Sequence, residues 1–254
     1  MSESRLRIGK ALARLGLCSR REAVKYLEHN IVEYEGELIT RPDFTIPDSI
    51  EALQRIVVSG KNNLAPDISR VLLFYKPVNV LSTHRKSGKY QENMKTIFDL
   101  LPEKYARWFF AGRLDFKSEG LMVLTADGDH IFQLSHPSGE CLKRYEIQTH
   151  RPLSGTEMQR MEKGIFSQGE KIAFHKIVSM PKPAHYMVEL YEGKNREIRR
   201  VLEKFNIRAV CLKRIQLGPY QLGSLAPGDF TELDKVSLPP ISHNRNERNN
   251  INHD

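Results

Sequence analysis

Residues 112–128 read Gly112-Arg113-Leu114-Asp115-Phe116-Lys117-Ser118-Glu119-Gly120-Leu121-Met122-Val123-Leu124-Thr125-Ala126-Asp127-Gly128. This stretch follows one apolar run and contains another. Residues 108–111 and 121–125 have the composition of buried strands. Asp115 is therefore expected on a short loop that the sheet anchors at both ends. Such support suits a catalytic side chain. A turn aspartate with an ordinary local hydrogen bond would look the same in the sequence.

Apolar spacing along the rest of the chain predicts strands and helices in an irregular order. We expect strands at 31–34, 38–39, 55–58, 71–75, 145–149, 172–178 and 186–191. Helices are expected within 5–30, as a pair, and near 96–101, 129–135, 155–164 and 195–205. Ser19-Arg20-Arg21-Glu22 has the pattern of a capping box at the start of the second helix. Strands outnumber helices without regular alternation, which predicts an α+β fold with a mixed, mostly antiparallel sheet.

Changes in composition divide the chain into three parts. The polar segment 60–70, which contains glycine and proline, is expected to be a linker. It separates a small domain, residues 1–62, from a larger domain, residues 63–236. Residues 237–254 are rich in Asn, Arg and His, and we expect this tail to be disordered.

Composition excludes several classes of protein. The three cysteines are far apart and form no CxxC pair, which favours a reducing cytoplasm over a disulfide framework. The nine histidines show no metal-ligand spacing, so no metal site is predicted. No segment approaches the length of an apolar membrane span or of a signal core. The net charge of +8 points to a polyanionic partner.

The first concentration of positive charge lies in residues 1–30, which hold seven Lys or Arg against three Glu. Residues 31–60 reverse the balance, with two Arg against six acids. One basic surface on the helix pair would suit contacts to a phosphate backbone, although a solvated helical face is the alternative. The predicted RNA-binding residues there are Arg5, Lys10, Arg14, Arg20 and Arg21.

The second concentration lies at 192–214, with eight Lys or Arg against three Glu. On a helix over 195–205, the apolar side chains fall on one side. Arg196, Arg199 and Arg200 fall on the other side, where their guanidinium groups would be held out toward phosphate or carboxylate. Surface salt bridges to nearby glutamates are the structural alternative.

The loop with Asp115 resembles the catalytic motif of pseudouridine synthases, and the match extends through Leu124-Thr125-Ala126-Asp127-Gly128. The resemblance implies that Asp115 is the catalytic aspartate and that Arg113 helps to displace the flipped base. Lys143-Arg144-Tyr145 resembles the family's Lys-x-Tyr motif, in which the tyrosine packs against the target base. Glu192 to Arg200 resembles its third motif, in which a basic residue pairs with the catalytic aspartate; the alignment implies that this residue is Arg199, with Arg196 as the alternative. Lys143, Arg196 and Arg200 are then expected near the RNA.

The N-terminal residues resemble an S4-like RNA-binding domain, from Arg5-Leu6 through Gly16 and then Cys18-Ser19-Arg20-Arg21-Glu22-Ala23. An S4-like module before this catalytic domain resembles the RsuA branch, which modifies ribosomal RNA, and in particular its large-subunit, RluB-like members. Tyr75-Lys76-Pro77 is similar to the same branch. Glu28-His29-Asn30 and Tyr34-Glu35-Gly36 depart from the usual S4-like pattern.

The resemblance implies isomerisation of a uridine in ribosomal RNA or in a pre-ribosomal particle. The target is expected in 23S rRNA, with 16S rRNA as the alternative. The nucleotide must be flipped out to be reached. An arginine beside Asp115 would favour the ionised carboxylate, which either attacks C1′ or removes the proton at C2′. No cofactor is expected, and the enzyme is expected to be a monomer.

Three other functions compete with this one. A non-catalytic ribosome assembly factor would explain the basic clusters but not the ordered motifs. A glycoside hydrolase using Asp115 and Glu119 would need a carboxylate pair, and four residues of spacing is a weak signal for one. An RNA methyltransferase would need a glycine-rich cofactor loop after a strand, and Gly218-Pro219 and Gly223 lack that context.

Overall fold

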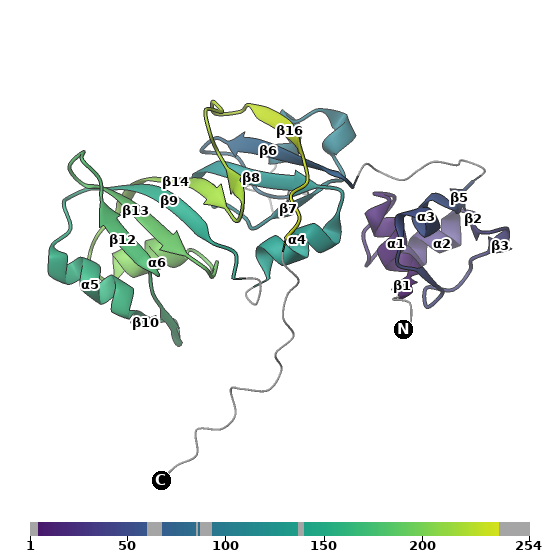
Figure 1. The fold of residues 1–254 in the computed structure, drawn as a ribbon, viewed down its shortest axis with the longest axis horizontal. Coiled ribbons are helices and arrows are strands. Elements are labelled where there is room, and N and C mark those ends of the chain that lie inside the picture. The colour runs from purple at the N-terminus through teal and green to yellow at the C-terminus, as the bar shows by residue number, and fades with distance from the viewer. Residues whose placement is uncertain (1–4, 60–67, 85, 87–92, 137–139, 239–254) are drawn as a thin grey trace, which may run out of the picture.

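The computed structural model describes residues 5–59, 68–84, 86, 93–136 and 140–238. An N-terminal module, residues 5–59, precedes a larger body, residues 68–238 (Figure 1). Most of the predicted linker lies outside the described residues, as does the predicted tail apart from its first two positions.

Two small sheets and three short helices form the N-terminal module. Its elements are β1 (Arg5–Arg7), α1 (Ile8–Arg14), α2 (Ala23–His29), β2 (Val32–Tyr34), β3 (Glu37–Leu38), β4 (Thr45–Pro47), α3 (Ile50–Gln54) and β5 (Ile56–Val58). Strand β2 lies between β3 and β5, and β1 pairs with β4. Leu6, Ile8, Leu12, Val32 and Ile46 lie in one buried core. This burial is what stabilises such short elements.

The first helix was expected to start at residue 5, and it starts at Ile8. Arg5–Arg7 is instead extended, because it pairs antiparallel with Thr45–Pro47. Tertiary pairing therefore overrides the local helical spacing. At the second helix, the Ser19 amide donates to the Glu22 carboxylate at 3.0 Å, which is one half of the predicted capping box.

A nine-stranded sheet is the frame of the larger body. Its order is β12-β13-β9-β14-β8-β6-β16, with β7 on β8 and β15 on β14. The strands are β6 (Arg70–Lys76), β7 (Phe109–Ala111), β8 (Glu119–Thr125), β9 (Lys143–Thr149), β12 (Lys176–Ser179), β13 (His185–Leu190), β14 (Ala209–Leu217), β15 (Tyr220–Gln221) and β16 (Phe230–Asp234). Among the described strands of this sheet, only β14 and β8 pair in parallel. The predicted α+β fold with a mostly antiparallel sheet is confirmed.

Helices cover both faces of the sheet, since residues of β8 alternate between two cores. Met122 and Leu124 face the core that holds Val201 of α6 (Glu197–Glu203) and Met161 of α5 (Gly155–Lys163). Leu121 and Val123 face a second core with α4 (Gly128–Ser135). Figure 1 shows α5 and α6 beside the half of the sheet with β12 and β13, and α4 beside β7.

Several predicted elements differ from the observed ones. The predicted strand 172–178 is broken, because β11 (Glu170–Ile172) forms a hairpin with β10 (Ile165–Ser167) and only β12 joins the main sheet. The predicted helix 96–101 is a 3-10 helix over Ile97–Leu100, and Glu103–Tyr105 forms another. Strands β4, β14 and β16 and helix α3 were not predicted.

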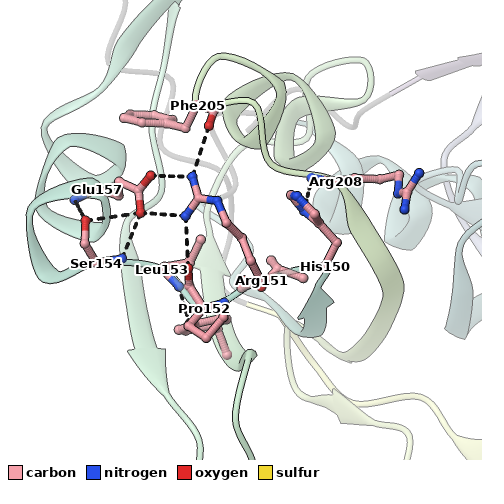
Figure 2. A network of polar contacts seen from close by, with 10 residues as sticks. His150, Arg151, Pro152, Leu153, Ser154, Glu157, Phe205 and Arg208 are labelled. Carbon is pink, nitrogen blue, oxygen red and sulfur yellow. Dashed lines mark hydrogen bonds and ion pairs between the residues drawn. The ribbon is translucent and has the colours of Figure 1, made fainter.

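A polar network at the end of β9 anchors both α5 and α6 (Figure 2). Arg151 makes two bonds to the Glu157 carboxylate, of 2.7 and 3.1 Å, and donates to the Phe205 carbonyl just beyond α6 at 3.3 Å. Ser154 and Glu157 form a capping box at the start of α5. The bonds to Arg151 and to the Ser154 amide lower the pKa of Glu157 to about 2. The network thus fixes the end of the helix that carries Arg199.

Candidate active site

The loop between β7 and β8 holds Asp115 in a fixed position. Ser118 donates its amide to the Asp115 carbonyl at 3.0 Å. The Ser82 hydroxyl donates to the Leu114 carbonyl at 2.9 Å and accepts from the Leu114 amide at 3.3 Å. The Asn79 amide donates to the Phe116 carbonyl at 2.7 Å. Leu114 and Phe116, the chain neighbours of Asp115, are thus bonded to the segment that follows β6, as expected for a pre-organised site.

Arg199 of α6 lies beside Asp115, with Nε 3.8 Å from Oδ2. Its Nη2 donates to the Lys117 carbonyl at 3.1 Å and to the Ser118 hydroxyl at 3.3 Å. The Arg199 side chain is 13% exposed and that of Asp115 is 34% exposed. Burial lowers the pKa of Arg199 and Asp115 opposes this effect. A guanidinium remains charged under such conditions, so the carboxylate of Asp115 has a cation beside it.

Tyr145 lies on β9, on the same side of the sheet as this ion pair. In the sheet it stands directly opposite Arg214 of β14, which in turn stands opposite Gly120 at the end of the Asp115 loop. The Tyr145 ring belongs to the buried cluster that includes Leu114 and Ile198, the chain neighbours of Asp115 and Arg199. The sheet therefore brings the three predicted catalytic residues to one region, with direct contact between Asp115 and Arg199.

Two buried cations lie behind the loop, and neither was predicted as a site residue. Lys76 is fully buried, and its ammonium donates to the carbonyls of Pro77 at 2.8 Å and Ser118 at 2.7 Å. Burial lowers the pKa of Lys76 to about 8, against the opposing charges of Asp115 and Glu119. Arg214 is 1% exposed. The sequence carried one signal for Lys76, its place in Tyr75-Lys76-Pro77 at the end of a buried strand.

Three residues predicted to contact RNA are buried instead, and for them the expected exposed position was wrong. Lys143 donates to the carbonyls of Cys141 and Tyr191, at 2.8 and 2.9 Å. Arg200 donates to the Ser167 carbonyl at 2.6 Å and pairs with Glu170 at 2.7 Å. Each therefore satisfies acceptors inside the protein, which is where a buried cation must find its partners.

Arg14 is the third of these residues. It pairs with Asp48 at 2.5 Å and with Asp129 of α4 in the larger body. Lys10 is half-buried and pairs with the same Asp129 at 2.8 Å. Both cations hold the N-terminal module against α4, and Arg107 adds bonds to the carbonyls of Gly16 and Leu17.

The other predicted RNA contacts are exposed. Arg113, Arg20 and Arg21 are exposed to solvent. Arg5 is exposed and bonded to Thr45, and Arg196 is exposed and 3.2 Å from Glu203. These side chains could exchange their present partners for phosphate at little cost, because exposed ion pairs contribute about 1 kcal/mol or less.

Within the described ranges, no three His, Cys, Asp or Glu side chains gather into a metal site. None of the described helices has the length and apolar composition that spanning a lipid bilayer requires.

Comparisons with known proteins show the family of the chain. The RNA pseudouridylate synthase family matches residues 70–204, more than half of the chain. An uncharacterised RNA pseudouridine synthase of Rickettsia typhi is 32% identical over 246 residues, covering 94% of this chain and 96% of the relative. Ribosomal large subunit pseudouridine synthase B of Salmonella typhimurium is 32% identical over 250 residues, covering 92% of this chain and 84% of the relative. A crystal structure of a pseudouridylate synthase matches the fold with a TM-score of 0.61 at 21% identity, covering 90% of this chain and 96% of that one. The chain belongs to the RNA pseudouridylate synthase family.

Proposed function

We propose that this enzyme converts a uridine of large-subunit ribosomal RNA to pseudouridine, with Asp115 as the catalytic carboxylate. The contact between Asp115 and Arg199 carries the proposal, because it sets a guanidinium of α6 beside a carboxylate on a loop that the sheet anchors. The choice of substrate is supported by relatives named as large-subunit enzymes in Salmonella and in Pseudomonas aeruginosa.

The reaction breaks the N1–C1′ bond, turns the base and joins C5 to C1′. The Asp115 carboxylate, with the Arg199 guanidinium beside it, is available either to attack C1′ or to take the C2′ proton. Tyr145 offers a flat ring for the extruded uracil. Arg113, exposed two residues before Asp115, fills the space that the flipped nucleotide leaves. Protein side chains supply every one of these roles, and no cofactor is included in the proposal.

The N-terminal module is proposed to be an S4-like RNA-binding domain. Its exposed Arg20 and Arg21 would contact the phosphate backbone of the rRNA or of a pre-ribosomal particle. We propose further that the protein acts as a monomer in the cytoplasm.

Tritium release tests the choice of substrate. Separate 23S and 16S transcripts labelled with tritium at uridine C5 are incubated with the enzyme, because joining C5 to C1′ expels that hydrogen. We expect release of about one tritium per 23S molecule and background release from 16S. Release from 16S alone would move the target to the small subunit. Binding to both without release would instead support an assembly factor.

A further inference from the structure

We propose that Arg214 is a positioning residue, which sets the Asp115 loop at a fixed distance from the strand that carries Tyr145. This inference rests on the proposed function. Arg214 lies in the centre of β14 and touches neither the loop tip nor the exposed surface, being 1% exposed. Its role would therefore be exerted through the backbone of the two segments that carry the reacting side chains.

The guanidinium of Arg214 bonds to the start of the loop and to the strand that follows it. Its Nε donates to the carbonyl of Leu121, which follows the loop, at 2.7 Å. Its Nη2 donates to the carbonyl of Gly112, where the loop begins, at 3.2 Å, and lies 3.4 Å from that of Ala111. A single rigid planar group therefore joins the strand before Asp115 to the strand after it.

The backbone of Arg214 is equally closely fitted. A Cβ on Gly120 would lie 2.3 Å from the Arg214 carbonyl oxygen and 2.7 Å from its nitrogen, so β8 and β14 approach as only glycine permits. The parallel ladder between them covers only two residue pairs, Lys213 with Glu119 and Arg214 with Gly120. After Arg214 the register of β14 on β9 shifts. Arg214 thus stands at the end of this short ladder, opposite the second residue of the strand that follows the loop.

The same residue stands directly opposite Tyr145 in the pairing of β14 with β9. One position is therefore linked by backbone pairing to the strand of Tyr145 and by its side chain to the loop of Asp115. A shift in Arg214 would change the separation of the two functional groups even if each kept its own local structure.

The charge of Arg214 makes a purely structural role a poor explanation. Among the ion pairs in the described part of the chain, none includes Arg214. A buried cation without a carboxylate is costly, and an apolar residue would fill the space at lower cost. What guanidinium alone offers is several donors in one plane, which reach the start of the loop and the strand that follows it at once.

Arg214→Lys in the full chain tests the proposal, because lysine keeps the positive charge but lacks the planar set of donors of a guanidinium. Single-turnover tritium release gives two quantities. The rate constant describes the reaction of the active molecules, and the amplitude gives the fraction of molecules that are active. We expect the rate constant to fall about 100-fold, as misplacement by about 1 Å can produce. The amplitude and the dissociation constant for RNA should stay within threefold of the parent.

The matched control is Lys213→Ala, on the opposite face of the same strand, where Lys213 pairs with half-buried Glu146. Its rate constant should equal that of the parent. A parental rate constant in Arg214→Lys, with or without a lower amplitude, would overturn the proposal and leave Arg214 as a stabilising residue only. If the parent protein itself releases no tritium from any rRNA, the proposed function fails, which is a separate result. Arg214→Gln, which is neutral and keeps two donors, replaces the lysine variant if that protein does not fold.

Discussion

The guanidinium of Arg199 lies beside Asp115, with Nε 3.8 Å from Oδ2, while its Nη2 holds the Lys117 carbonyl and the Ser118 hydroxyl of the same loop. In the part of the chain that the structure describes, Nε is buried and has no hydrogen-bond partner. Arg199 therefore both positions the loop and leaves a buried donor turned toward the carboxylate.

Arg199→Lys should lower the rate constant about 100-fold, because one ammonium cannot hold the loop and face Asp115 at the same time. Affinity for RNA should change little. Arg208→Ala is the control, since Arg208 is exposed close to the end of the same helix. Single-turnover tritium release and filter binding measure both quantities. Parental rates in Arg199→Lys would show that catalysis does not need a guanidinium at this position.

Arg20→Ala combined with Arg21→Ala should weaken RNA binding without changing the rate constant at saturating RNA. Both side chains are exposed on the N-terminal module. If each contacts one phosphate, the slope of log affinity against log salt falls by about 2. The control is Arg41→Ala with Arg55→Ala, which lie among the acidic residues of the module. An unchanged salt slope in the Arg20 and Arg21 variant would place the RNA elsewhere.

Glu157→Gln should destabilise the fold at neutral pH and less so in acid. The pKa of Glu157 is about 2 in the folded chain, against an ordinary value of 4.5. Its stabilising effect is therefore fully present above pH 4.5 and is lost as pH falls toward 2. We expect a loss of about 1–2 kcal/mol at pH 7, from the cap and the ion pair together. Urea unfolding from pH 3 to 7 measures it, with Glu203→Gln as the control. A difference from the parent that stays constant across this range would contradict the role of the Arg151 network.

Lys76→Met should reduce the increase in the free energy of unfolding that we expect for the parent protein as the pH rises from 8 to 10.5. The pKa of buried Lys76 is about 8, below its ordinary 10.5, so the unfolded chain binds this proton more tightly. The free energy of unfolding consequently rises from this group between pH 8 and 10.5, by an amount on the order of 3 kcal/mol. Urea unfolding of parent and variant across that range isolates the effect, and exposed Lys176→Met is the control. If the free energy of unfolding depends on pH in the same way in the parent and in Lys76→Met, Lys76 does not lose its proton in the folded state.

The sequence predicted the frame of the site well because its signals are local. Residues 108–111 and 121–125 are apolar runs on either side of a polar loop, and they form β7 and β8. The helix of Arg199 could be placed from its apolar spacing, and the contact with Asp115 from family resemblance. These predictions need no knowledge of distant segments.

Predictions failed where a distant segment covers a local surface. A helical projection places Arg200 on the solvent side, but the β10–β11 hairpin packs there. The guanidinium of Arg200 donates to the Ser167 carbonyl and pairs with Glu170 of this hairpin. Strand β14 was hidden because Lys213 and Arg214 interrupt its apolar pattern, and the segment looked like a surface charge cluster. Burial of a cation depends on carbonyls from other strands, which no local pattern reveals.

The most direct measurement of the central claim is tritium release from C5-labelled ribosomal RNA by the parent and by Asp115→Asn. The amide has nearly the shape of the carboxylate but can neither attack C1′ nor take a proton. We predict that Asp115→Asn binds the RNA as tightly as the parent and releases no label above background. Release at the parental rate by the Asn variant would contradict the account, because the ionised carboxylate would then not be the reacting group.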